Sequence, residues 1–461
     1  MSLHLLSGRS RYGAAVAVAL SLAACQSVND RVLSVTDPDV IPPSDLTTAS
    51  AASAASVSLA YGAINTFRAT TGAAESSWLF GGLLADEWST SSTFIENDET
   101  DQRKVREFNG SVTGMLRNLY RVRTRANQAL VAMLQYNPTQ RTLISELYFA
   151  RGFAELQLAS DFCNGIPIGT TTGALPPEDG LPISTQAVFA KAAASLDSAI
   201  LFANGTDTAS VARLQAARVA RARVALNLSD FAGAGALVTV ANVPTSAAYR
   251  HTFSLTTGTN TIWGQGASAR RYTIGDSLEG NARNIVVANA IPFTSVRDPR
   301  VPVTVTTIAS QDGQTFSRTT TLFGQLTSVD VTSGLDARLI EAEVALRAGS
   351  PTWLTILNGL RAAPPRLGDV QPTVLPPLLD PGTEAARVSL LFREKAFWTF
   401  SRGQRLGDMR RLIRQYGRTE ANTFPRGVHY KGGNYGTDVN LPVVTDERNN
   451  PNFKGCTDRL P

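Results

Sequence analysis

Apolar residues in the middle of the chain recur at every third or fourth position, which is the spacing of a buried stripe along an α-helix. Residues 113–136 and 140–160 form one pair of such segments, and residues 185–203 and 208–228 form a second pair. Asn-Pro separates the first two segments and Asn-Gly separates the second two, so each pair is expected to fold as a helical hairpin. Small residues, mostly Ala, occupy many stripe positions, which lets the helices approach closely.

Further helices are expected on both sides of these hairpins. Repeated helical hairpins of this length are typical of tetratricopeptide-like units, although no strict period of about 34 residues is visible. Residues 75–90 form an aromatic amphipathic segment, and the polar stretch 91–110 is expected to be a loop. The additional predicted helices are 49–68, 231–241, 332–348, 351–362, 383–401 and 404–416.

The composition changes between residues 243 and 330, where Gly, Thr, Ser and Pro accompany short runs of alternating hydrophobicity. This stretch is too long for a simple connection, so a functional insertion of loops and short strands is expected. The predicted fold is therefore mainly α, with a tetratricopeptide-like helical-repeat body. We expect a single domain over residues 49–461, with helical parts 49–242 and 330–416, the insertion 243–330 and a C-terminal tail 417–461.

The first 25 residues carry the pattern of a lipoprotein signal. Two Arg residues precede an apolar run that is too short to span a bilayer, and small residues lead into Cys25. We expect cleavage to remove the signal peptide 1–24 and to leave a lipid-modified Cys25 at the new N-terminus. Residues 25–48 are polar and contain Pro, so they are interpreted as a tether. Membrane attachment is expected through the lipid anchor alone.

Composition narrows the classes of function. Hydrophobic residues make up 43% and charged residues 18% of the chain, which is typical of a globular protein. The net charge of +5 is spread along the chain without a basic block, so no nucleic-acid partner is expected. Three His and three Cys leave little room for a metal site, and the Gly-rich residues 432–436 lack the Lys-Ser/Thr of a phosphate loop. No metal and no cofactor are therefore expected.

Several stretches resemble segments of the SusD/RagB family. Residues 150–156 and 161–169 are similar to its Arg-containing helix and the Phe-Gly-x-(Val/Ile)-Pro turn that follows it. Residues 392–398 and 403–411 resemble its Glu-Arg … Gly-x-Arg-x-x-Asp-x-Arg-Arg segment. The series continues with the Arg-x-x-Glu-x-x-Leu-x-x-Ala helix at 338–346, Asn440-Leu441-Pro442, and Asn450-Pro451-Asn452.

Two departures from the family pattern indicate a divergent branch. Phe162-Cys163-Asn164-Gly165 replaces the Phe-Gly pair, and the second Pro of the terminal Leu-x-Pro-Ile-Pro run is absent. For such a branch the identity of the ligand cannot be carried over from the family.

The resemblance implies a surface-exposed lipoprotein anchored in the cell outer membrane. Family members capture glycan or peptide nutrients for a TonB-dependent, SusC-like transporter, and they bind without catalysing a reaction. Accordingly, no catalytic residue is assigned. Two alternatives remain open: a lipid-anchored helical-repeat scaffold that holds envelope proteins together, and a glycoside hydrolase.

Candidate ligand contacts are aromatic residues outside the repeat helices, because aromatic rings can pack against the apolar faces of sugar rings. Trp263 lies in a Gly-containing loop of the insertion, where burial is not forced, and Tyr272 follows it. Trp78 and Trp88 lie in the N-terminal aromatic segment. For all four residues the competing interpretation is packing in the core.

The densest charge cluster lies near the end of the helical region, and no His is close to it in sequence. We therefore expect ion pairs that clamp the last two helices rather than catalysis. Glu341 and Glu343 are two positions apart, so they point to different faces of their helix and cannot act as a catalytic pair. The cluster comprises Arg393, Glu394, Arg405, Asp408, Arg410 and Arg411.

Two thiols remain once Cys25 carries lipid, namely Cys163 and Cys456. In an exported chain such a pair tends to oxidise, so a disulfide between them is expected. The bridge would fix the C-terminal tail to the helical body. The alternative is two free thiols.

Overall fold

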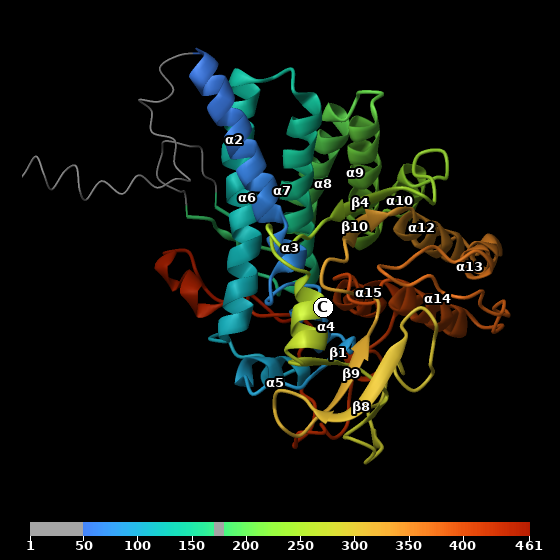
Figure 1. Ribbon diagram of the computed structural model, residues 1–461. Helices are drawn as coiled ribbons and strands as arrows, with labels where there is room; N and C mark the ends of the chain where they lie inside the picture. The colour runs from blue at the N-terminus through green and yellow to red at the C-terminus, as the bar shows by residue number, and fades with distance from the viewer. Residues whose placement is uncertain (1–48, 170–178) are drawn as a thin grey trace, which may run out of the picture. The chain divides into compact units, whose positions relative to one another are not determined.

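The computed structural model describes residues 49–169 and 179–461. Residues 56–461 form one compact unit where they are described, and the first residues of helix α2 (Ala49–Phe67) precede it. Helices dominate this unit and its strands are short, so the prediction of a mainly α fold is confirmed (Figure 1). Cys25 and the predicted signal peptide and tether lie outside the described residues. Within the described part, none of the helices has the length and apolar character that crossing a bilayer requires.

Four long helices stand side by side in chain order (Figure 1). They are α6 (Gly110–Tyr136), α7 (Arg141–Asp161), α8 (Thr185–Phe202) and α9 (Thr208–Asn227). They correspond to the two predicted hairpins, with ends that differ by a few residues from those expected.

Side chains cap three of these helices at their N-termini. Asn109 accepts hydrogen bonds from the backbone N–H groups at the start of α6, and Ser184 and Asp207 do the same for α8 and α9. Helix α7 is buried along most of its length. Gly152 lets it approach α8, because a Cβ there would lie 2.7 Å from Cγ of Leu196.

A second group of helices packs against the first. Helix α12 (Gly334–Arg347) contacts α9 and α10 (Phe231–Leu237), and α15 (Arg405–Tyr416) contacts α7. Buried residues from both groups belong to one continuous apolar cluster. The helical stripes on either side of the insertion are therefore buried against each other. The group is completed by α13 (Thr352–Ala362) and α14 (Glu384–Trp398).

The described strands pair in five two-stranded sheets, mostly within the insertion. The pair β1–β5 connects the N-terminal aromatic segment to the insertion, with Trp88 opposite Ile274. The pairs are β1 (Trp88–Thr90) with β5 (Tyr272–Ile274), β4 (Ala248–His251) with β10 (Val329–Ser333), β2 (Ile166–Pro167) with β3 (Pro182–Ile183), β6 (Leu278–Glu279) with β7 (Ile285–Val286), and β8 (Val303–Ala309) with β9 (Phe316–Thr320).

Short helices fill the remaining connections. One of them, α5 (Ile95–Asp101), lies in the stretch 91–110, so the prediction of a loop there is wrong for these seven residues. Its first turn contains Glu96 and Asp98, which favour a helix N-terminus. The others are α3 (Ala69–Gly72), α4 (Phe80–Leu84), α11 (Thr261–Trp263), η2 (Gly264–Ser268), η3 (Glu420–Asn422) and η4 (Thr445–Asn449).

The C-terminal tail is fixed to the end of α7. Cys163 and Cys456 form a disulfide with a Cα–Cα distance of 5.8 Å, as expected from the sequence. Next to it, Nδ2 of Asn164 donates a hydrogen bond of 2.8 Å to Asp458. The tail is thus bound to the helical body by a covalent bond and by polar contacts.

Candidate functional site

Three of the four aromatic residues proposed from the sequence are buried. The exposed fraction is 0% for Trp78, 2% for Trp88 and 4% for Tyr272. Their rings offer no face to a ligand, so the prediction of ligand contact is wrong for these three residues.

The reason is that the aromatic segment packs under the link between α14 and α15. The ring of Trp88 lies 5.2 Å from that of Phe400, and its Nε1–H donates a hydrogen bond to Oγ of Ser401. The Ser401 hydroxyl in turn donates to the carbonyl oxygen of Trp78. These contacts join residues more than three hundred positions apart in the sequence. Local sequence patterns cannot predict contacts at that separation.

Trp263 is only partly buried. It ends α11 and packs against the main apolar cluster with part of its side chain. The side chain of Asn260 caps this short helix by accepting from the backbone N–H groups of Ile262 and Trp263. Contact between Trp263 and a ligand stays a prediction.

The structure presents a different aromatic residue on the surface, Phe94, with an exposed fraction of 44%. It precedes α5, and its backbone N–H donates to Oγ of Ser92. The guanidinium of Arg271, from the insertion, lies over the Phe94 ring at 4.7 Å from its centroid. One face of the ring is therefore covered by the guanidinium, and the exposed part of the ring is accessible to a ligand. Ile95, also exposed, extends this apolar surface.

Polar groups gather around Ser92, two residues before Phe94. Gln311 accepts a hydrogen bond from Ser92, and Lys431 donates to the carbonyl oxygen of the same Ser92 at 2.8 Å. Nε of Arg271 is buried and has no hydrogen-bond partner among the described residues. We call Phe94, Ile95, Arg271, Gln311 and Lys431 the Phe94 surface. It joins the N-terminal segment, the insertion and the tail.

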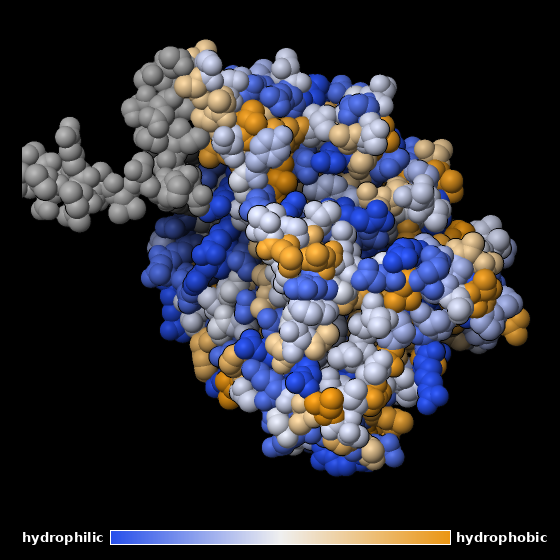
Figure 2. Space-filling view, in the orientation of Figure 1, coloured by the Kyte–Doolittle hydropathy of each residue, from blue (hydrophilic) through white to orange (hydrophobic). Residues whose placement is uncertain are grey.

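This combination suits binding of a ligand with apolar faces and polar edges. The partly open ring of Phe94 supplies apolar contact, and the Arg271 guanidinium and the Gln311 amide supply polar groups. The Lys431 ammonium is already bonded to Ser92, Asp98 and Asp312 and so holds the loop rather than the ligand. Over the face of the molecule shown in Figure 2, hydrophobic residues form small separate groups among polar ones. Phe94 was not among the residues predicted from the sequence, because the stretch 91–110 is polar and was expected to be a loop.

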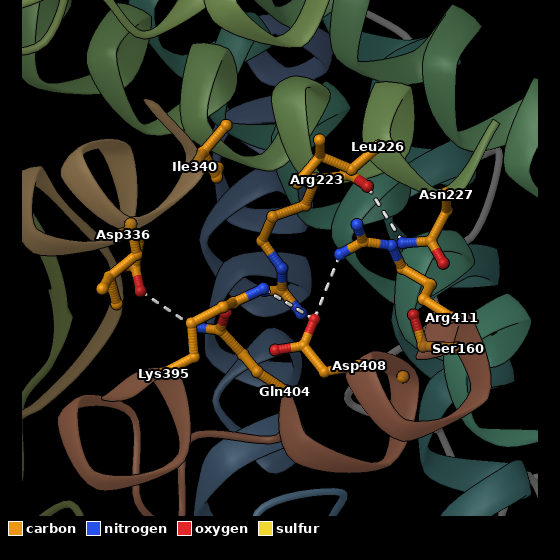
Figure 3. Close-up of a pocket in the computed structure, with 12 residues that line it drawn as sticks. Ser160, Arg223, Leu226, Asn227, Asp336, Ile340, Lys395, Gln404, Asp408 and Arg411 are labelled. Carbon is orange, nitrogen blue, oxygen red and sulfur yellow. Dashed lines mark hydrogen bonds and ion pairs between the residues drawn. The ribbon is translucent and has the colours of Figure 1, made fainter. Parts of the chain in front are cut away.

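Five of the six residues of the charge cluster are buried, whereas Arg393 is exposed and lies over the ring of Phe397 at 5.7 Å. Figure 3 shows Lys395 and Arg411 both directed at Asp408, and the same two cations also contact Glu343 of α12. Arg405 pairs with Asp86 of the N-terminal segment. The prediction of ion pairs is therefore confirmed, but the partners extend well beyond the last two helices.

Two other members of the cluster also bond outside α14 and α15. Glu394 is paired with Arg300 of the insertion and Arg361 of α13. Arg410 donates to the carbonyl oxygens of Ala159 and Ser160 at the C-terminal end of α7. The network thus ties the last two helices to most of the unit.

Two of the buried carboxylates, those of Glu343 and Glu87, are not accessible to a sugar. Glu87 accepts a hydrogen bond from the backbone N–H of Ser401. A general acid and its partner must both reach the sugar, which these residues cannot do. In the described part of the chain, no group of three or more His, Cys, Asp or Glu is arranged to hold a metal ion.

Glu87 makes the free energy of unfolding depend on pH between 4.5 and about 8. Burial raises the pKa of its carboxyl from 4.5 to about 8. Between these values the folded chain holds a proton that the unfolded chain releases, so the free energy of unfolding falls as the pH rises toward 8. We expect the free energy of unfolding to fall by about 2 kcal/mol through this group as the pH rises from about 6 to about 8.

Urea unfolding of the wild type and of Glu87→Gln across this pH range tests the effect. Gln keeps an oxygen that accepts from Ser401 but does not titrate, so its profile should be flatter. Identical pH profiles of the two proteins would contradict the role given to Glu87.

Comparison with known proteins identifies the fold. No family model matches the sequence, and no curated protein matches it. Solved structures do match over most of the chain. A SusD-like carbohydrate binding protein from Bacteroides fragilis NCTC 9343 has a TM-score of 0.61 at 13% identity, covering 88% of this chain and 99% of its own.

Two further structures agree with this match. Surface glycan-binding protein A from Bacteroides uniformis has a TM-score of 0.59 at 14% identity, covering 87% of this chain and 99% of its own. A SusD superfamily protein from Bacteroides vulgatus ATCC 8482 has a TM-score of 0.58 at 15% identity, covering 89% and 99%. The chain therefore has the SusD-like fold, and the resemblance inferred from its sequence is confirmed at that level.

Proposed function

We propose that this chain, which has the SusD-like fold, is a lipid-anchored surface protein that captures oligosaccharides or peptides for a TonB-dependent, SusC-like transporter of the outer membrane. The observation that carries the proposal is the match along nearly the whole chain to proteins named for carbohydrate or glycan binding. Glycans are therefore the first ligand class to test. The Cys25 processing signal supports attachment to a membrane by lipid.

The Phe94 surface supports binding as the activity. It has a partly exposed ring with the Arg271 guanidinium over it, while the buried carboxyl of Glu87 is hydrogen-bonded within the protein. The protein is proposed to bind its ligand and release it unchanged. Turnover of glycans by the purified protein would favour the glycoside hydrolase instead.

Replacing Phe94 with Ala should weaken ligand binding about tenfold, because a stacked aromatic contact contributes on the order of 1–2 kcal/mol. The melting temperature should change little, since Phe94 lies at the surface with an exposed fraction of 44%. Calorimetric titration with the ligands found in a glycan and peptide binding screen measures the effect.

Phe108 offers a matched control. Its exposed fraction is 63%, and the guanidinium of Arg106 lies over its ring at 4.5 Å, so it reproduces the Arg–Phe stack outside the Phe94 surface. Phe108→Ala should bind ligand as the wild type does. Equal losses in both variants, or none in Phe94→Ala, would remove the Phe94 surface from the proposal.

Replacing Cys25 with Ala should leave the precursor uncleaved or the protein unanchored. The thiol of Cys25 is the group expected to receive the diacylglyceryl chain before cleavage, and Ala cannot accept it. Labelling with radioactive palmitate, followed by membrane fractionation, measures the effect. Lipid incorporation at the wild-type level in the variant would show that another residue carries the anchor.

A further inference from the structure

A small polar pocket lies where α9 meets α12, α14 and α15 (Figure 3). The space open to the centre of a water molecule is about 20 Å³, which holds one or two waters or one small ion. Arg223 and Asn227 of α9 form one wall. Asp336, Lys395 and Asp408 come from the helices opposite.

Arg223 reaches this pocket without a partner of its own. Its exposed fraction is 8%, and Nη1 of its guanidinium is buried with no hydrogen-bond partner among the described residues. None of the ion pairs in the described part of the chain includes it. On one side the guanidinium faces the ring of Phe153, at 5.6 Å from its centroid. A buried guanidinium stays protonated, so an uncompensated charge here is costly.

The other charges around the pocket already compensate one another. Asp336 accepts from Arg402 at 2.6 Å and from Gln404 at 2.9 Å. Asp408 accepts from Lys395 at 2.8 Å and from Arg411 at 3.2 Å, both through its Oδ1. Glu343, which does not line the pocket, also pairs with Lys395 and Arg411.

One positive charge is therefore left in excess. Three carboxylates, those of Asp336, Glu343 and Asp408, face the cations Lys395, Arg402, Arg411 and Arg223. Asp161 lies next outward and acts on both Arg223 and Arg410, so Asp161 and Arg410 add one charge of each sign and leave the excess of one positive charge. A water molecule could satisfy the hydrogen-bonding capacity of Nη1 but not its charge.

We propose that this pocket binds one small monovalent anion, of the size of chloride, against Nη1 of Arg223. The anion completes the charge balance and supplies the missing acceptor. Because the pocket is formed by α9 on one side and by α12, α14 and α15 on the other, the bound anion stabilises the packing of the two helical groups. This site is independent of the Phe94 surface and of the ligand it binds.

Crystals of the full chain soaked in sodium bromide give the most direct test. A bromide anomalous peak at hydrogen-bond distance from Nη1 of Arg223 is expected. Density for water alone, bridging Arg223 to Oδ2 of Asp408 and carrying no anomalous signal, would overturn the proposal.

Thermal unfolding in solution gives a second readout. The melting temperature of the wild type should be higher in sodium chloride than in sodium gluconate of equal ionic strength, by on the order of 2 °C. Arg223→Gln should lose this difference. Arg221→Gln, on the same helix as Arg223, removes an outer ion pair with Asp197 of α8 and should keep the difference. A chloride effect equal in both variants would assign it to general salt screening and would contradict the proposal.

Discussion

Replacing Glu343 with Gln should lower the free energy of unfolding by about 4 kcal/mol at neutral pH. The Glu343 carboxylate is fully buried and accepts from Lys395 at 2.9 Å, from Arg411 and from the hydroxyl of Tyr416 at 2.7 Å. Gln preserves the shape but removes the charge, so two buried cations share the remaining carboxylate of Asp408. Urea unfolding followed by circular dichroism measures the loss.

The effect should depend on pH in a defined direction. Burial alone would raise the pKa of Glu343, but the charges of Arg411 and Lys395 hold it at about 2, below its ordinary value of 4.5. The stabilisation is therefore present above pH 4.5 and is lost as the pH falls toward 2. The difference in free energy of unfolding between the wild type and Glu343→Gln should therefore become smaller as the pH falls through that range.

Glu341 supplies the control, because it lies on the same helix and pairs with Arg338 from a half-buried position. Glu341→Gln should cost about 1 kcal/mol or less. Equal losses for the two substitutions would contradict the account of Glu343 as the centre of the network.

Reducing the bridge between Cys163 and Cys456 should destabilise the chain by up to about 5 kcal/mol, since the bridge closes a loop of 293 positions and restricts the unfolded chain. The largest loss is expected for global unfolding. Polar contacts such as the hydrogen bond from Asn164 to Asp458 would still hold part of the tail in the native state.

Urea unfolding of the oxidised and reduced wild type measures the loss, with Cys456→Ser as the variant that cannot form the bridge. Reductant should leave the stability of Cys456→Ser unchanged. Non-reducing peptide mapping of protein taken directly from the cell envelope checks the bond itself, and free thiols at both positions would contradict it.

The helices were predictable because their signal is local. Stripes at helical spacing and Asn-Gly or Asn-Pro breaks placed the second predicted segment at 140–160, and the structure has α7 at Arg141–Asp161. The disulfide was also predictable, since only two thiols remained after Cys25. Helix α5 was missed because its sequence, with Asp and Glu throughout, carries no apolar stripe.

The candidate site was harder to predict because it depends on contacts between distant segments. The sequence leaves open whether Trp88 lies at the surface or in the core. Its burial depends on the hydrogen bond to Ser401 and the contact with Phe400, both more than three hundred positions away. In the sequence Phe94 is an apolar residue in a polar stretch. Its contact with Arg271, from the distant insertion, is visible only in the structure. Glu343 and Arg223 were likewise not predicted as special, because their roles depend on burial and on partners in other helices. The spacing of residues in the sequence shows neither.

Affinity purification of the tagged full chain from detergent-solubilised membranes tests the central claim most directly. The account predicts that a large β-barrel protein of the TonB-dependent class co-purifies with the wild type and remains bound to Phe94→Ala, whose defect lies in ligand binding alone. Recovery of soluble envelope proteins without such a barrel would contradict the claim and favour the helical-repeat scaffold.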